Sequence, residues 1–354
     1  MLNAPNGGTD HPIGTGPFVF QEWIPNDHFT ATANKEYWRP GLPYLSSITY
    51  KPIPDESARA QALESGTIDM MHTSDAQNVK TFRGNTQWSF ADNIGGKISN
   101  PNVNCIMMNC SQAPFDNIEA RRIVATAVSG SQYAKLMDLG VAQPAYGIYQ
   151  KGSPFYGPTS YPKYNQSTAK KLAAAYKKKH GKALSFSINV VAAPQNIRQG
   201  EYLQQVMKNI GVNVTVKTYQ QNDLINQALF GTYQATEWSQ FGSISPDTNY
   251  VWFSPTTAHA TGLSINMARN IDTQIEQAFY TGMGSTNVKT RIAAFKKINE
   301  RLGADIPYVW TDASFFALVS KNNVQNWNNP TTPAGKKALG QDGGTWWPTQ
   351  MWKS

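Results

Sequence analysis

The sequence predicts an α/β fold, and one strand–helix–strand unit is its clearest indication. Apolar residues alternate strictly with polar ones over 184–190, as in a strand with one buried face. A stretch with apolar residues on one helical face follows and ends at Gly211, and the alternation resumes over 212–216. Strand, helix and strand at this length predict a right-handed βαβ crossover with parallel strands.

Composition and charge indicate a folded protein of about two domains. The 354 residues are 40% hydrophobic and 12% aromatic, while 15% are charged. The net charge is +8, yet the densest basic run, Lys177–Lys179, falls in the last turn of a predicted helix, where cations complement the helix dipole. We therefore expect no nucleic-acid partner. No apolar run reaches the roughly 18 residues that a membrane span requires.

The first part of the chain, residues 14–110, alternates short strand patterns with Pro and Gly. The stretches "FVFQEW", "HFTATAN" and "SITYKPI" show period-2 patterning or β-branched enrichment, which predicts three strands. One helix interrupts them, with Asp55 placed to cap it and Gly66 placed to end it. The apolar pattern "NCIMMN" predicts a further strand before residue 110.

From residue 114 to about 303, helical patterns alternate with strands. Besides the βαβ unit, we expect a strand over 233–238 and helices over 119–129 and 221–230. We expect two more helices, one that starts at a cap at Ser167 and ends at Gly181, and one that follows a cap at Asn287. Strand patterns return after residue 305. This reversal predicts one lobe inserted between two parts of the other: residues 1–108 and 309–354 belong to lobe I, and residues 109–308 form lobe II.

The sequence lacks motifs for catalysis, cofactors or metals. Gly14-Thr-Gly16 precedes a strand and has no third glycine, so it is not a dinucleotide loop. There is no P-loop and no Gly-x-Ser-x-Gly elbow, and the five histidines are scattered. Cys105 and Cys110, on one strand, would lie about 16 Å apart on opposite faces, so we expect free thiols. We therefore expect no enzymatic activity, cofactor or metal.

Aromatic residues are the feature that points to binding. Most of the tryptophans serve core packing and turn anchoring. Trp238 differs, because it stands where the strand over 233–238 gives way to the polar loop "SQFGSISPDTNY". Ligands of open α/β sheets bind at the carboxyl ends of strands, where a flat side chain can stack on an organic molecule.

Several motifs resemble a known family. "IGTGPFVFQEW" and "ANKEYWRPGLPYLSSITYKPIPDESARAQALESGTIDMM" are similar to the signature of the extracytoplasmic solute-binding proteins of ABC transporters, the oligopeptide, dipeptide and nickel-binding family 5. "NCSQAPFDNIEARRIVATAVS", "GVAQPAYGIY", "YPKYNQSTAKKLAAA" and "MKNIGVNVTV" follow in the family's order. The resemblance implies a two-lobe, type II-like periplasmic-binding-protein architecture, joined by a hinge.

The resemblance also implies the function, the partners and the location. It implies the substrate-binding component of an ABC importer, which captures a peptide or another medium-sized organic solute between its lobes and delivers it to membrane permease subunits. The protein is then extracytoplasmic, and the full-length protein carries a lipid anchor. Family members are longer and start with a signal peptide, which is not present in this chain. We therefore expect a carboxy-terminal portion with lobe I incomplete and with exposed apolar surface.

The resemblance places candidate ligand contacts on lobe II. Trp238 would stack on the solute, Gln240 would form a hydrogen bond with it and Phe241 would form an apolar wall. Phe241 occupies a position where peptide-binding members keep an aspartate, and Asp247 is expected to hold the loop in place. Asn109, at the hinge, would contact the ligand or a lobe. Weaker ligand-binding candidates complete the set: Tyr146, Asn266 and Arg269.

One alternative is a ligand-sensing domain of a transcription regulator with the same fold. A helix-turn-helix upstream of Met1 would indicate that class, whereas a signal peptide with a lipid-anchored cysteine would indicate the transport protein. A hydrolase would need a nucleophile with a base, and the sequence offers no such pair.

Overall fold

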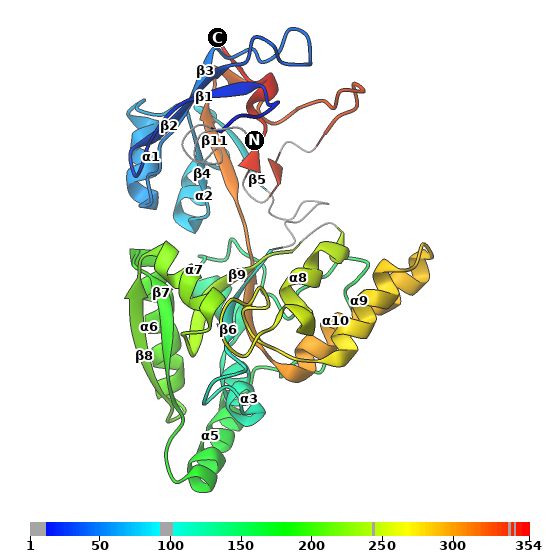
Figure 1. The fold of residues 1–354 in the computed structure, drawn as a ribbon. Helices are drawn as coiled ribbons and strands as arrows, with labels where there is room; N and C mark the ends of the chain where they lie inside the picture. Colours follow the sequence, from blue (N-terminus) through cyan, green and yellow to red (C-terminus); the bar gives the residue numbers. More distant parts are fainter. Residues whose placement is uncertain (1–11, 93–101, 243–244, 339–340, 343–344) are drawn as a thin grey trace. The chain divides into compact units, whose positions relative to one another are not determined.

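The computed structural model describes residues 12–92, 102–242, 245–338, 341–342 and 345–354. Contacts between residues divide the chain into two compact units. Unit 1 comprises residues 1–98 and 315–354, and unit 2 comprises residues 99–314. Unit 2 is thus inserted in the sequence between two segments of unit 1, as the ribbon colours in Figure 1 show.

A five-stranded mixed sheet forms the centre of unit 2. Its strand order is β10-β6-β9-β7-β8. β7 is parallel to β8 and β9, whereas β6 is antiparallel to β9 and β10. The bounds are β6 Val103–Met108, β7 Ser185–Val191, β8 Asn213–Tyr219, β9 Ala235–Gln240 and β10 Tyr308–Ala313. The predicted βαβ unit is confirmed, because β7 and β8 are parallel neighbours joined by helix α6.

Helices cover both faces of this sheet (Figure 1). Their bounds are α3 Ile118–Ala127, α4 Gly130–Leu136, α5 Gln166–His180, α6 Pro194–Lys208, α7 Gln221–Phe230, α8 Tyr250–Phe253, α9 Thr273–Met283 and α10 Val288–Asp305, with short 3-10 turns η2 Pro246–Asn249 and η3 Pro255–Thr257. Helix α5 begins one residue earlier than its predicted cap, Ser167. Asn165 caps it instead, because the Asn165 side chain accepts a hydrogen bond from the Thr168 amide. Gly181 ends the helix in the left-handed conformation, as predicted.

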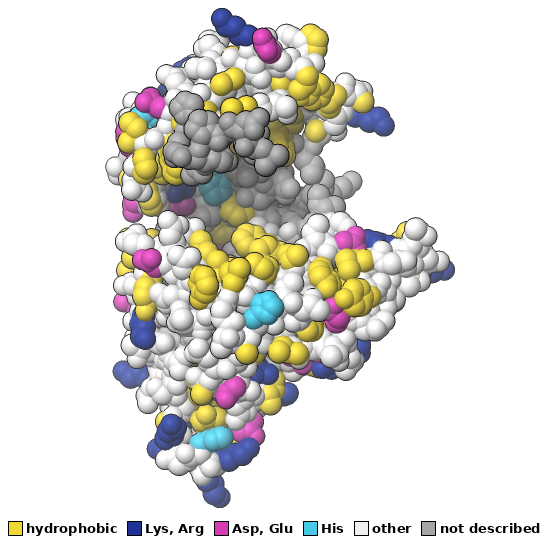
Figure 2. All heavy atoms as spheres, viewed as in Figure 1, with side chains coloured by type: hydrophobic (Ala, Val, Ile, Leu, Met, Phe, Trp, Pro, Cys, Tyr) yellow, Lys and Arg dark blue, Asp and Glu magenta, His cyan; other side chains and the backbone are white. Residues whose placement is uncertain are grey.

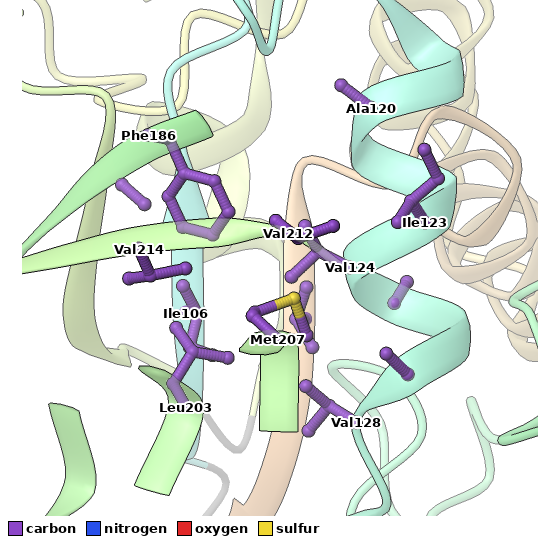
Figure 3. Packing of buried hydrophobic residues seen from close by; sticks show 14 of the residues in the cluster. Ile106, Ala120, Ile123, Val124, Val128, Phe186, Leu203, Met207, Val212 and Val214 are labelled. Carbon is purple, nitrogen blue, oxygen red and sulfur yellow. The ribbon is translucent and has the colours of Figure 1, made fainter. Parts of the chain in front are cut away.

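Among the described residues of unit 2, two apolar clusters form the core, one on each face of the sheet. Successive residues of β6 contribute to them in alternation: Ile106 packs in one cluster, and Cys105 and Met107 pack in the other. Helices α3, α5 and α6 supply the first cluster, and α7, α9 and α10 supply the second. Figure 3 shows side chains of α3 and α6 in the first cluster. Burial of each large apolar side chain stabilises the fold by about 1.5–3 kcal/mol.

The described residues of unit 1 form two three-stranded antiparallel sheets and two short helices. Their bounds are β1 Phe18–Ile24, β2 His28–Ala33 and β3 Ser47–Tyr50 in one sheet, β4 Met70–Thr73, β11 Ala317–Lys321 and β5 Trp88–Asp92 in the other, with α1 Glu56–Glu64 and α2 Ala76–Phe82. This unit also contains two two-stranded pairs and a 3-10 turn. They are β12–β15 (Val324–Gln325, Trp352–Lys353), β13–β14 (Gln341–Asp342, Thr345–Trp346) and η4 Pro348–Gln350. Asp55 caps α1 as predicted. Strand β1 leaves Val19, Trp23 and Ile24 exposed.

Candidate functional site

The candidate site lies where β9 ends in unit 2. The strand reaches Gln240, two residues beyond its predicted end, so that Trp238 is inside the strand and Phe241 begins the loop. Trp238 is partly buried and packs against the cluster under α9 and α10. Phe241 is 44% exposed.

Three aromatic rings from this region form a continuous surface, which we call the aromatic wall: Trp238, Phe241 and Trp252. The rings of Trp238 and Phe241 meet edge-on, with centroids 6.5 Å apart. Trp252, from α8, lies 5.0 Å from Phe241 at an interplanar angle of 35°. Figure 2 shows hydrophobic side chains gathered over the part of unit 2 that contains α7, β9 and α8. The wall offers ring faces and edges to a flat or apolar group.

Polar contacts hold the loop that follows β9. The Arg291 guanidinium of α10 pairs with the Asp247 carboxylate at 2.6 Å, and the Ser245 hydroxyl donates to the same carboxylate at 2.7 Å. Burial opposes ionisation of Asp247, but the hydrogen bonds from Arg291 and Ser245 outweigh it and lower the pKa of this carboxyl. Asn249 donates from Nδ2 to the Phe241 carbonyl at 2.9 Å. These contacts fix the backbone on which Phe241 stands.

A second carboxylate ties α8 to α9. Glu276 accepts hydrogen bonds from the Tyr250 hydroxyl at 2.9 Å and from the Ser254 hydroxyl. Burial raises the pKa of Glu276, but the hydrogen bonds from Ser254, Tyr280 and Tyr250 lower it by more. Asp247 and Glu276 therefore both serve the framework behind the aromatic wall.

Three of the predicted ligand contacts are enclosed within unit 2. Asn109 is fully buried, and its Nδ2 donates to the backbone carbonyls of Gly231 and Tyr233. Asn266 donates from Nδ2 to the carbonyls of Ser254 and Asn270. In this arrangement both amides hold segments of backbone together, and neither side chain forms part of the aromatic wall.

The guanidinium of Arg269 is likewise used inside unit 2. Its nitrogens donate to the backbone carbonyls of five residues: Ala228, Leu229, His259, Gly262 and Met267. The side chain is 3% exposed and fastens the 259–269 segment to the end of α7. Its ligand role was an expectation from the family resemblance, and the packing gives it a structural one.

The remaining predicted contacts differ in accessibility. Gln240 is buried, and its Nε2 has no hydrogen-bond partner in the described part of the chain; the same holds for the indole Nε1 of Trp238. Tyr146 is half exposed, in the segment between α4 and α5. Trp252 was not among the predicted contacts. Its sequence signal was an aromatic cluster directly after the polar loop, at "NYVWF".

Metal binding and membrane spanning find no support in the described residues. Among them, no group of three His, Cys, Asp or Glu side chains could hold a metal ion. No helix in the described ranges is long and apolar enough to cross a membrane. The two cysteines are free, as predicted, and burial raises the pKa of Cys110 to about 11.

Comparison with protein families gives a match over residues 2–262, to the family described as bacterial extracellular solute-binding proteins, family 5. The chain belongs to this family. The binding protein is 24% identical over 324 residues to the glutathione-binding protein GsiB of Pectobacterium atrosepticum, covering 88% of this chain and 60% of that relative. It therefore spans less than two thirds of the length of that curated relative.

Solved structures share the fold of the binding protein. DppA from Helicobacter pylori, a periplasmic binding protein in complex with the peptide STSA, matches with a TM-score of 0.81 at 21% identity, over 94% of this chain and 64% of that one. NikZ from Campylobacter jejuni, in complex with Ni(L-His), matches with a TM-score of 0.80 at 18% identity, over 97% of this chain and 69% of that one. The predicted two-lobe periplasmic-binding-protein fold class is thereby confirmed.

Proposed function

We propose that the binding protein captures a peptide or another medium-sized organic solute and delivers it to the permease subunits of an ABC importer. The family match supports a solute-binding role. The relatives and structural neighbours named above are binding proteins, so the proposal includes no catalytic activity. Units 1 and 2 would correspond to lobes I and II, and a solute that contacts both would favour a closed arrangement. The protein would act outside the cytoplasm, anchored by lipid.

The aromatic wall carries the proposal for the solute contacts on unit 2. Phe241 keeps 44% of its surface exposed although it contacts two other rings. The carboxylates behind it are engaged, Asp247 by Arg291 and Glu276 by hydroxyl groups. The wall therefore favours an apolar or planar part of the solute, held by stacking, over an ammonium group held by an ion pair.

A capture experiment tests this function. The whole chain is incubated with a pooled tripeptide library and, separately, with a bacterial metabolite extract, and retained solutes are detected by native mass spectrometry. We expect the wild type to retain solute, and Phe241→Ala and Trp252→Ala to retain roughly tenfold less, since a lost aromatic contact is worth about 1 kcal/mol or more.

The matched control is Tyr156→Ala. Tyr156 is also 44% exposed but is not part of the wall. Circular dichroism verifies that each variant is folded. If the wild type retained no solute from either pool, the transport role would be contradicted. If Tyr156→Ala and Phe241→Ala retained equal amounts of solute, the assignment of the aromatic wall as the solute contact would be contradicted.

A further inference from the structure

Unit 2 contains a second group of side chains, on the opposite face of the sheet from the aromatic wall. Neighbouring residues of a strand point to opposite faces. Trp238 packs against the cluster under α9 and α10, whereas Glu237 contacts α6, where the Asn196 amide donates to its Oε1 at 2.6 Å. Glu237 thus begins a group that has no part in the proposed solute site.

Two more carboxylates accompany Glu237. Asp312, on β10, is fully buried and accepts hydrogen bonds from Asn104 at 2.7 Å and Thr311 at 2.8 Å. Asp138 follows α4 and is 7% exposed. Asp312 lies close enough to both for its charge to raise the pKa of Asp138 and of Glu237.

Three hydrogen-bond acceptors of this group are buried and have no partner among the residues that the structure describes. They are Asp138 Oδ2, Glu237 Oε2 and Gln199 Oε1. Gln199 lies one helical turn from Asn196 on α6, on the same side of the helix as the amide that donates to Glu237. Buried acceptors are nearly always paired in native proteins, so these three oxygens can accept hydrogen bonds that the described residues do not supply.

Aromatic rings border the same group. Tyr133 of α4 contacts Tyr202 of α6, with ring centroids 5.6 Å apart and an interplanar angle of 78°. Tyr202 lies one turn beyond Gln199 on α6. The charges of Asp312, Glu237 and Asp138 all act on the Tyr133 hydroxyl, whose pKa is raised first by burial and then by these carboxylates. The rings and the acceptors are therefore neighbours.

No cation compensates these carboxylates within the described ranges. None of the ion pairs found there involves Asp138, Glu237 or Asp312, and no Lys or Arg contributes to their pKa shifts. The described residues also form no group that could hold a metal ion. A larger cation with several N–H donors suits this group, because its donors could serve acceptors that stand on three segments: α6, β9 and the residues after α4.

We propose that Asp138, Glu237 and Gln199, together with the rings of Tyr133 and Tyr202, bind an organic cation that carries N–H donors, an alkylammonium or guanidinium group. Charge-assisted hydrogen bonds would supply the donors that the acceptors lack, and the tyrosine rings would attract the cation by their faces. Gln199, Tyr202 and Glu237 are each partly exposed, so the group reaches the surface of unit 2.

Binding at this group would release protons. Burial raises the pKa of Glu237 to about 8. The hydrogen bond from Asn196 opposes this shift, and the charge of Asp312 adds to it. Burial and the charge of Asp312 also raise the pKa of Asp138 to about 8. Other titratable groups that face these carboxyls are Tyr133 from α4 and Tyr202 from α6, and the charge of Asp312 also acts on Cys105, which packs on the other face of the sheet. At neutral pH a bound cation would ionise these carboxyls, and the displaced protons would pass to the buffer.

Isothermal titration calorimetry on the whole chain tests the proposal. The probes are n-butylammonium chloride and methylguanidinium chloride, with tetramethylammonium chloride at equal ionic strength as a cation that has no N–H donor. We expect saturable binding of at least one donor-bearing probe at neutral pH, none of tetramethylammonium, and an enthalpy that differs between phosphate and HEPES buffers because protons are released.

Variants locate the binding. Asp138→Asn keeps the shape but removes an ionisable acceptor and is expected to weaken binding roughly tenfold to a hundredfold, as for a lost charged hydrogen bond. Gln199→Leu changes no charge and is expected to weaken binding several-fold. Glu201→Gln, an exposed change on the same helix, is the control and leaves binding unchanged.

Two outcomes would overturn the proposal. The first is the absence of saturable heat from both donor-bearing probes, which would mean that the carboxyls only hold protons. The second is equal binding by Asp138→Asn and the wild type. Neither experiment uses a transported solute or the aromatic wall, so the cation site and the transport role stand or fall separately.

Discussion

Replacing Asp138 by asparagine is expected to make the protein less sensitive to rising pH. The Asp138 carboxyl is 7% exposed, and no basic residue in the described ranges is paired with it. Its pKa is about 8 in the folded protein, against an ordinary value of 3.8. Between these two values the folded protein holds a proton that the unfolded chain has lost. Raising the pH in this window therefore favours the unfolded chain. The stabilisation that Asp138 contributes is complete below its pKa in the unfolded chain and is lost as the pH rises through its pKa in the folded protein.

The size of the effect follows from the width of the window. Each pH unit inside it removes about 1.4 kcal/mol, so that a change from about pH 5 to about pH 7 removes ~2.7 kcal/mol from the free energy of unfolding of the wild type. Asp138→Asn does not titrate and avoids this loss. The difference in unfolding free energy between Asp138→Asn and the wild type should therefore shift by ~2.7 kcal/mol in favour of the variant over this interval.

Urea unfolding monitored by circular dichroism measures this difference at both pH values. Comparing variant and wild type cancels the titration of all other groups that the substitution leaves alone. Asp223→Asn, the same chemical change at an exposed position of α7, is the control and should show a constant difference. A difference for Asp138→Asn that is equal at both pH values would refute the reasoning, because it would show that the carboxyl is ionised in the folded protein.

Two further predictions concern the packing of unit 2. Leu203→Ala removes a side chain that is 1% exposed between α6 and the sheet, and we expect it to lower the free energy of unfolding by about 2–5 kcal/mol in urea, whereas an unchanged value would contradict the described core. Cys110, whose pKa is raised to about 11, should resist alkylation by iodoacetamide at mildly alkaline pH in the folded protein and react on unfolding; mass spectrometry would detect early modification if the thiol were accessible and ionised.

The relation between sequence and structure differs from one feature to the next. The alternation over 184–190 and 212–216 predicted β7 and β8 because a strand with a buried face repeats every two residues. The cap at Asn287 was predicted because its side-chain oxygen serves amides of the next turn, which are only two and three residues away. Such features depend on near neighbours along the chain, so the sequence displays them.

The roles of buried polar side chains, in contrast, do not depend on near neighbours along the chain. Asn266 and Arg269 were expected as ligand contacts from the family resemblance. In the structure they donate to backbone carbonyls, and Arg269 reaches the end of α7 about forty positions earlier in the chain. No local pattern indicates which backbone groups a folded chain leaves in need of a donor.

The sequence by itself determined the α/β class, the order of most strands and helices, the family, and the presence of Trp238 and Phe241 where β9 meets its loop. Only the tertiary structure decided that Trp252 joins them, and that Asp138, Gln199, Glu237 and Asp312 come together on the other face. The physical reason is that sheet pairing and helix packing bring distant residues into contact. Burial then sets the charge state of those residues, and burial is a property of the assembled fold.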